Sequence, residues 1–337
     1  MMDWINCIES NINWLLESGE PWTAYRTRLD LLGQTEADGE VQADYQTMLA
    51  HCQVQGLIIR AASWPGYALR RHNDTAHPLY ALSTLADFGL SECEPGICQV
   101  ISTITARQSA EGAFLTQINI PKAFGGTDQD QWTWMLCDSP TLLYTLLAMG
   151  REEDPKVRCA ALHLVDLVQE NGWRCTAAPE LGKFKGPGRR ADPCPIANVY
   201  ALKALSFFPE FLDNLVTRLG AESLLNHWQH RAEFKPYLFG IGTDFHKLKY
   251  PFIWYDILHV VEVLSHYEFV HTDPRFKEMV EALLIQADPQ GRFTARSMYQ
   301  PWKGWSFADK KKPSPWLTFL VYRILRRIDN HHYSYQN

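Results

Sequence analysis

The chain has 337 residues, of which 32 are Lys or Arg and 38 are Asp or Glu, giving a net charge of −6 at 46% hydrophobic content. This composition is typical of a globular protein with a large core, and it lacks the basic surface that phosphate binding requires, which excludes a nucleic-acid partner. No run of about 18 apolar residues is free of charges, so a transmembrane helix is excluded as well.

The amino terminus and the cysteines predict a cytoplasmic protein. Acidic residues (Asp3, Glu9, Glu17 and Glu20) stand where a signal peptide would carry a cationic segment followed by an apolar one. The 8 cysteines are scattered along a chain without an export signal, so we expect reduced thiols.

Residues 1–65 are expected to form helices that supply the first hairpin of the fold or a cap on it. The segments 8–18, 25–33 and 45–53 are helical in character. This part of the chain precedes a longer region, 66–328, in which a repeat is visible.

Prolines open apolar segments at intervals of roughly 60 residues in this region. Two interleaved sets of prolines predict a repeated pair of helices, because proline is well tolerated in the first turn, where its missing N–H would be unpaired. The first set is Pro78, Pro140, Pro195, Pro251 and Pro315, and the second set is Pro95, Pro155, Pro209 and Pro274.

Apolar spacing and stop signals support the helical interpretation. After Pro274 the apolar residues follow the spacing of an amphipathic helix, and several second-set helices end at a glycine followed by an aromatic residue (Gly112, Gly172 and Gly291). Alternating patterns of β-branched residues are essentially absent, so we expect no strands. The polar tail 329–337 is expected to be disordered.

The length of the repeat favours a closed ring over an open solenoid. Open helical solenoids use periods of about 34 to 47 residues, whereas here the extra residues lie in long loops before the first-set helices. We therefore predict an all-α fold, an α/α toroid of about five to six hairpins with inner and outer helix rings, whose loops meet at one mouth.

The segment Gln108-x-x-x-Gly112-x-Phe114 resembles the glutamine–tryptophan repeat of squalene cyclases, with Phe in place of Trp. Looser copies begin at Gln169 and Gln286. The chain is thus similar to the superfamily of terpenoid cyclases and protein prenyltransferase β subunits. This resemblance implies the same toroid and an enzyme that binds an apolar or isoprenoid-like small molecule in a central cavity.

Acidic residues stand at or next to the predicted starts of the inner helices, namely Asp138, Asp192 and Asp256, and His259 follows one turn after Asp256. Helix N-termini carry unpaired N–H groups and a positive dipole end, which suit anions and shift nearby pKa values. We regard these four residues as candidate catalytic acids and bases. The alternative is that the aspartates cap helices and that His259 is a core histidine.

The resemblance also implies a zinc site. Asp192 and Cys194 resemble the Asp-x-Cys zinc ligands of prenyltransferase β subunits, and Asp256 stands near the place of the third ligand, a histidine in that family. Arg189 and Arg190 stand where the family holds an isoprenoid diphosphate. Asp and Cys are plausible zinc ligands, although Cys194 could equally be a small buried residue.

Tryptophans gather in or next to the loops before the inner helices, and we expect Trp134 and Trp254 to contact a bound molecule. Aromatic faces can stabilise a carbocation, although anchoring of long loops is an equally good explanation. The Asp-x-Asp-Asp motif of class II cyclases is missing. A second function therefore stays open, that of a non-catalytic toroid module that binds a peptide or protein through its rim loops.

Overall fold

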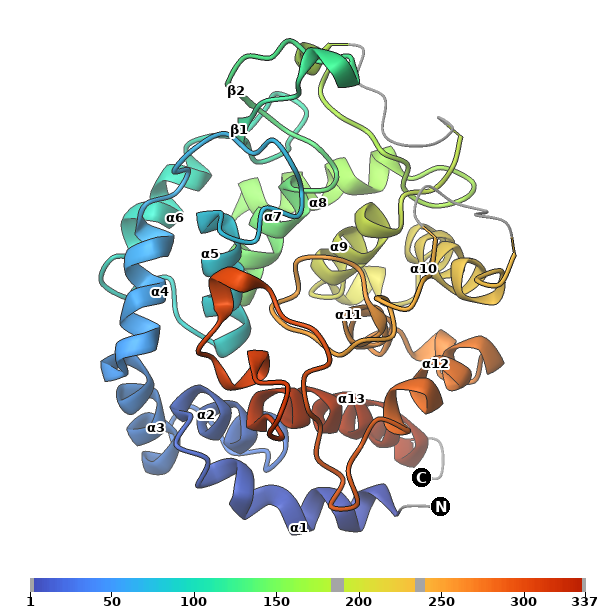
Figure 1. Ribbon diagram of the computed structural model, residues 1–337. Helices are drawn as coiled ribbons and strands as arrows, with labels where there is room; N and C mark the ends of the chain where they lie inside the picture. Colours follow the sequence, from blue (N-terminus) through green and yellow to red (C-terminus); the bar gives the residue numbers. More distant parts are fainter. Residues whose placement is uncertain (1–2, 183–190, 234–239, 335–337) are drawn as a thin grey trace. The chain divides into compact units, whose positions relative to one another are not determined.

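The computed structural model describes residues 3–182, 191–233 and 240–334 (Figure 1). The chain forms two compact units. Unit 1 contains Met1–Leu57, Thr243–Phe252 and Asp256–Asn337, and unit 2 contains Ile58–Gly242 and Ile253–Tyr255. The boundary between the first segments of the two units falls within helix α4 (Cys52–Ala62).

Unit 2 is built from helical hairpins. Helices α5, α7 and α9 lie side by side, and α8 and α10 pack against α7 and α9 respectively (Figure 1). The helices of this unit are α5 (Pro78–Phe88), α6 (Cys98–Thr105), α7 (Ser139–Ala148), α8 (Pro155–Leu167), α9 (Pro195–Leu205) and α10 (Leu215–Gln229).

Unit 1 combines helices from both ends of the chain. Helix α13 packs against α1, α2 and α11, while α12 packs against α11. The helices of this unit are α1 (Trp4–Leu16), α2 (Pro21–Asp30), α3 (Gly39–Ala50), α11 (Ile257–Leu264), α12 (Pro274–Leu284) and α13 (Pro315–Ser334). Helix α13 continues through Ser334, so the tail predicted to be disordered from residue 329 is helical over its first part.

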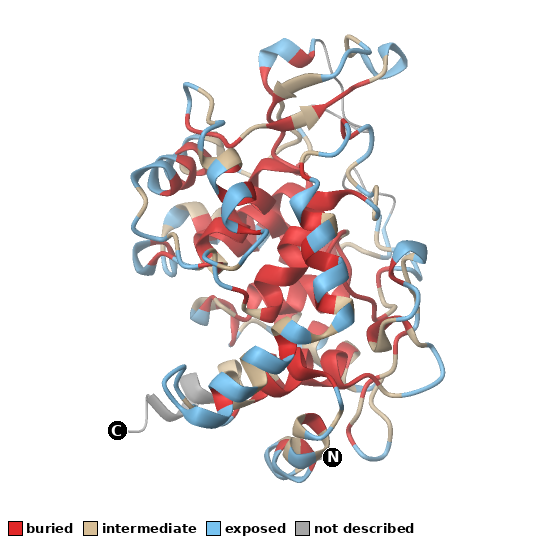
Figure 2. Cartoon of the chain, turned by 90° about the vertical axis from the view of Figure 1, so that its left-hand side faces the viewer, coloured by how far each residue is buried: buried red, intermediate tan, exposed pale blue. Residues whose placement is uncertain are grey.

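Burial separates the two predicted kinds of helix. Every residue of α5, α9 and α11 is buried, and so is every residue of α7 except the last. In α8 and α12 buried residues alternate with exposed ones, as in amphipathic surface helices. Figure 2 shows helices that are buried along their length beside helices with an exposed face. The all-α class and the alternation of inner and outer helices are therefore confirmed.

The prolines mark helix starts at most, but not all, of the predicted positions. Helices α5, α8, α9, α12 and α13 begin at a proline. The prediction is wrong at Pro95, Pro209 and Pro251, because α6, α10 and α11 begin later in the chain. In α10 and α11 the start is set instead by a capping side chain, Asn214 or Asp256, which accepts a backbone N–H of the first turn.

The expectation of no strands is wrong in one loop. Between α6 and α7, strand β1 (Thr116–Ile118) pairs antiparallel with β2 (Gln131–Thr133), and Thr116 lies opposite Thr133. Strands of three residues are too short to show a period in the sequence. Short 3-10 helices occupy other loops, namely Lys122–Phe124, Pro179–Leu181, Pro209–Phe211, Glu268–Val270, Gln300–Trp302 and Ser306–Ala308.

The glutamine–aromatic repeat ties neighbouring hairpins together. The side-chain Nε2 of Gln108 donates to the carbonyl oxygens of Gly112 and of Lys156, the latter in α8, at 2.7 Å each. Gly112 adopts φ of +112°, a backbone conformation that favours glycine, and the Phe114 side chain is buried. The motif thus links the end of one outer helix to the next outer helix.

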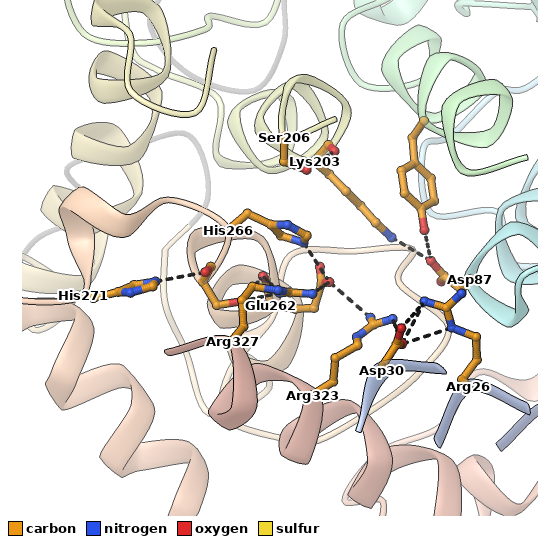
Figure 3. A network of polar contacts seen from close by, with 12 residues as sticks. Arg26, Asp30, Asp87, Lys203, Ser206, Glu262, His266, His271, Arg323 and Arg327 are labelled. Carbon is orange, nitrogen blue, oxygen red and sulfur yellow. Dashed lines mark hydrogen bonds and ion pairs between the residues drawn. The ribbon is translucent and has the colours of Figure 1, made fainter. Parts of the chain in front are cut away.

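A buried ion-pair network joins α11 to α13 in unit 1 (Figure 3). The Glu262 carboxylate, 2% exposed, lies 3.2 Å from the Arg323 guanidinium and 3.7 Å from that of Arg327, and the His266 ring lies 3.3 Å away. Burial alone would raise the pKa of Glu262, but His266 and the two arginines outweigh it and hold the pKa well below its usual range. The network therefore holds a stable carboxylate in the core.

A second buried ion pair joins α5 to α9 in unit 2. The Lys203 ammonium lies 3.0 Å from the Asp87 carboxylate, and both side chains are almost fully buried. The same carboxylate accepts a hydrogen bond from the Tyr144 hydroxyl, and the ammonium also lies 3.9 Å from the centre of the Tyr144 ring. Three neighbouring inner helices are thus connected through one aspartate.

In the described part of the chain, no helix has the length and apolar character needed to cross a membrane.

Candidate functional site

Buried polar residues occupy the N-cap positions of three inner helices, although only the Asp256 side chain accepts a capping hydrogen bond. Asp138 precedes α7 and Cys194 precedes α9 in unit 2, and Asp256 precedes α11 in unit 1. Asp138 is 1% exposed and Asp256 is fully buried. The sequence prediction that acids and a thiol stand at inner-helix starts is therefore confirmed for these three positions, each within its own unit.

Asp256 is a buried carboxyl group that caps α11 with one of its two oxygens. Its Oδ1 accepts the backbone N–H of His259 at 3.1 Å, whereas Oδ2 has no hydrogen-bond partner among the described residues. Burial raises the pKa of Asp256 to about 7, against the opposing charge of Lys249 and the backbone hydrogen bonds of the helix. The group can therefore gain or lose a proton near neutral pH.

The neighbours of Asp256 in unit 1 explain why its charge is not neutralised. The ammonium group of Lys249 forms an ion pair with Asp244 at 2.8 Å, so its charge is already partly compensated. His259, predicted as a catalytic residue, has its ring stacked on that of Phe252 with a centroid distance of 4.6 Å. His259 is thus held by its backbone N–H on Asp256 and by its ring on Phe252.

Asp138 forms an ion pair with a histidine that the sequence analysis did not select. The Nδ1 of His72 lies 3.2 and 3.3 Å from the two carboxylate oxygens. Burial lowers the pKa of His72, but the charge and hydrogen bond of Asp138 outweigh it, and the net effect is a raised pKa. His72 lies in a loop, where no helical spacing marks it in the sequence. Only its position shortly before an inner helix could have identified it as a candidate site residue.

The start of α7 is held in place by the glutamine–aromatic repeat. The Ser139 hydroxyl donates to the carbonyl oxygen of Phe114 at 3.0 Å, and the backbone N–H of Asp138 donates to Met135. His77, another histidine of this region, has a structural role: its ring accepts from the backbone N–H of Leu79 and caps α5. Hydrogen bonds from Ser139 to Phe114 and from Asp138 to Met135 thus fix the position of Asp138.

Three thiols lie in contact next to this pair. The thiols of Cys137, Cys175 and Cys194 perturb one another's pKa, and none is in a disulfide. Hydrogen bonds from Cys137 and Cys175 hold the pKa of Cys194 well below its usual range, while the contact with Cys175 raises the pKa of Cys137. The sequence analysis named Cys194 but missed Cys175, because only the pairing of distant loops brings it close.

The predicted zinc site stays a prediction. Asp192 is half-buried in the loop before α9, and it belongs with Cys194 to unit 2, whereas Asp256 belongs to unit 1. Among residues 3–182, 191–233 and 240–329, no group of three or more His, Cys, Asp or Glu side chains could hold a metal ion. We therefore assign no chemical step to zinc. Arg189 and Arg190, predicted to bind an anionic group, lie outside the described residues.

The two selected tryptophans occupy different environments. Trp134 is buried, with its ring edge-on to that of His163 at 4.8 Å, and its carbonyl oxygen accepts the backbone N–H of Ala178. Trp254 is partly exposed, with its ring 5.9 Å from that of Tyr255. The packing of Trp134 agrees with loop anchoring, and a binding role for either residue stays a prediction.

No family model and no curated protein sequence matches the chain. Among solved structures, it is similar to the type II terpene cyclase MstE from Scytonema, with a TM-score of 0.45 and 12% identity over 98% of each chain. A variant of that cyclase in complex with geranylgeranyl dihydroxybenzoate, its substrate, gives a TM-score of 0.44 and 12% identity over 97% of each chain.

A third similar structure is the unsaturated glucuronyl hydrolase from Bacillus sp. GL1, responsible for the degradation of glycosaminoglycan. Its TM-score is 0.46 at 15% identity, with 92% of this chain and 84% of that chain covered. At identities of 12–15% and TM-scores below 0.5, these likenesses carry no conclusion about this chain.

Proposed function

We propose that the protein is an enzyme that transfers a proton to an apolar or isoprenoid-like small molecule, with Asp256 as the general acid. The observation that carries this proposal is the fully buried carboxyl group of Asp256, whose Oδ2 has no hydrogen-bond partner among the described residues and whose pKa is about 7. An ordinary aspartate is ionised at neutral pH and has no proton to give, whereas a carboxyl group of this pKa is about half protonated at pH 7 and largely protonated at lower pH.

A protonated Asp256 would favour an apolar molecule. A protonated carboxyl group carries no net charge, so an uncharged hydrocarbon can lie against it without separating an ion from its partner. Protonation of an alkene creates a cation, and aromatic rings such as that of Phe252, which packs beside His259, can stabilise positive charge with their faces. The class of molecule agrees with the resemblance of the sequence to terpenoid cyclases.

Asp138 and His72 have a different character from Asp256. Asp138 favours the protonated imidazole of His72, so the pair can accept or relay a proton. We assign to this pair a separate acid–base role in unit 2. Replacement of His72 by Gln would test it, because the role predicts a change in the pH dependence of turnover.

The experiment is the turnover of polyprenyl compounds by Asp256→Asn. Asparagine keeps the size of the side chain and can still cap α11, but it has no carboxylic proton. We expect wild-type protein to convert at least one member of a panel of squalene, geranylgeraniol and geranylgeranyl dihydroxybenzoate, and the variant to lose about 10²- to 10⁴-fold in rate.

Asp273→Asn is the matched control, since Asp273 also caps a helix of unit 1, α12, but is partly exposed and pairs with Arg275. It should retain most of the activity. Thermal unfolding of both variants would verify that they fold. Turnover by Asp256→Asn at the wild-type rate would exclude Asp256 as the acid, and no conversion of any polyprenyl compound by wild type would exclude the proposed substrate class.

A further inference from the structure

Backbone pairing brings three cysteines of unit 2 together from separate loops. The loop before α7 pairs with the segment 175–178: Leu136 N–H donates to the carbonyl oxygen of Thr176 at 3.0 Å, and Met135 lies opposite Ala177. The next residue of each segment is a cysteine, Cys137 and Cys175. Their adjacency is therefore fixed by main-chain hydrogen bonds.

The loop before α9 pairs with the other end of the same central segment. Cys194 N–H donates to the carbonyl oxygen of Trp173 at 2.8 Å, and Arg174 lies opposite Pro193. Cys175 thus stands on the segment that pairs with both loops, and its thiol interacts with those of Cys137 and Cys194. Because Cys137 and Cys175 directly follow the antiparallel pairing of Met135 with Ala177, a disulfide can form between them with little movement of the backbone.

We propose that Cys137 and Cys175 form a redox-active dithiol that closes to a disulfide on reaction with a low-molecular-weight disulfide. Cys175 is the only one of the three with partial exposure, since Cys137 and Cys194 are buried, so it is the thiol that an external disulfide meets. Cys137 is then the partner on the directly paired segment. This inference does not depend on the proposed function, which rests on a different helix.

The reaction proceeds by two thiol–disulfide exchanges. The contact with Cys137 lowers the pKa of Cys175, but the Cys194 thiol and burial outweigh it and raise the pKa, so Cys175 loses its proton at alkaline pH. Its thiolate then attacks one sulfur of the external disulfide, which forms a mixed disulfide and releases the first thiolate. Cys137 then loses its proton and attacks the Cys175 sulfur, which closes the internal disulfide and releases the second thiolate. The two protons pass to the two released thiolates, so the protein loses two hydrogens and the external disulfide is reduced to two thiols.

The experiment exposes the full chain to glutathione disulfide, blocks the remaining thiols with iodoacetamide and maps the peptides by mass spectrometry without reduction. We expect a cross-linked peptide pair that contains Cys137 and Cys175, and its loss on return to excess glutathione. The exposed cysteines, such as Cys93, serve as an internal control, because they should carry at most a mixed disulfide with glutathione.

Single serine variants separate the possible pairings, and thermal unfolding shows whether each variant folds. Cys194→Ser should keep the cross-link, and Cys137→Ser should stop at a glutathione adduct on Cys175. Three results would overturn the proposal: a cross-link that uses Cys194 in wild type, full alkylation of all three thiols after oxidation, or one bound zinc ion per chain that protects all three from alkylation.

Discussion

The ion-pair network of Glu262 predicts a large loss of stability when its charge is removed. In Glu262→Gln the arginines at 3.2 and 3.7 Å would lose a carboxylate that is 2% exposed. Breaking a buried ion pair by removing one partner typically costs about 3–5 kcal/mol. Arg323 keeps Asp30 at 3.5 Å and Arg327 keeps the Ser265 hydroxyl at 2.5 Å, so we expect a value near the lower end, about 3 kcal/mol.

Urea unfolding at pH 7 measures this loss, with Glu281→Gln on α12 as the control. Glu281 is exposed, so its replacement should change the free energy of unfolding by no more than about 0.5 kcal/mol. The folded-state pKa of Glu262 is depressed, so its contribution is present above its unfolded pKa and is lost as pH falls through the folded value. A variant as stable as wild type at pH 7 would refute the account of the network.

Three further predictions concern other parts of the core. The folded-state pKa of Asp256 is about 7, so the cost of ionising it destabilises wild type as pH rises from about 4 to 7, by roughly 4 kcal/mol for a shift of about three units. The stability of Asp256→Asn should not fall in this way between pH 4 and 7. If the free energy of unfolding depended on pH equally in wild type and in Asp256→Asn, the prediction would be contradicted. Lys203→Met should cost about 3–5 kcal/mol by removing the ammonium from buried Asp87, and Lys203→Met with Asp87→Asn should recover part of that loss in urea unfolding. Gly220→Ala should destabilise by about 1–3 kcal/mol, because its Cβ would lie 2.3 Å from the buried ring of Trp173, whereas Gly56→Ala in α4, with open space around it, should stabilise by up to about 1 kcal/mol. Equal changes in melting temperature for these two alanine variants would show that the contact with Trp173 does not affect stability.

The sequence predicted the helical repeat because its signals are local. A proline in the first turn, a capping aspartate such as Asp154 or Asp273, and apolar spacing all act within a few residues, and the helices they predicted are present. Where two local signals competed, as at Pro251 and Asp256, the capping side chain set the start of the helix. The difference between inner and outer helices was also predictable, since it follows from composition.

The partners within the candidate site depend on contacts between segments far apart in the chain. His72 reaches Asp138 across 66 residues, and Cys175 joins Cys137 and Cys194 only through pairing of irregular loops. No spacing rule in a single sequence encodes such contacts. The sequence analysis therefore selected Asp138, Asp256 and Cys194 from their positions before helices, but it could assign neither the ion pair of Asp138 nor the raised pKa of Asp256.

The central claim is that Asp256 is a proton donor near neutral pH, and direct titration of its carboxyl group tests it. Infrared difference spectra of protein labelled with ¹³C-aspartate, recorded across the pH range and compared with Asp256→Asn, would isolate this group. The account predicts a protonated carboxyl signal that titrates near pH 7 and is missing in the variant. A spectrum in which Asp256 is already ionised at pH 5 would contradict the claim.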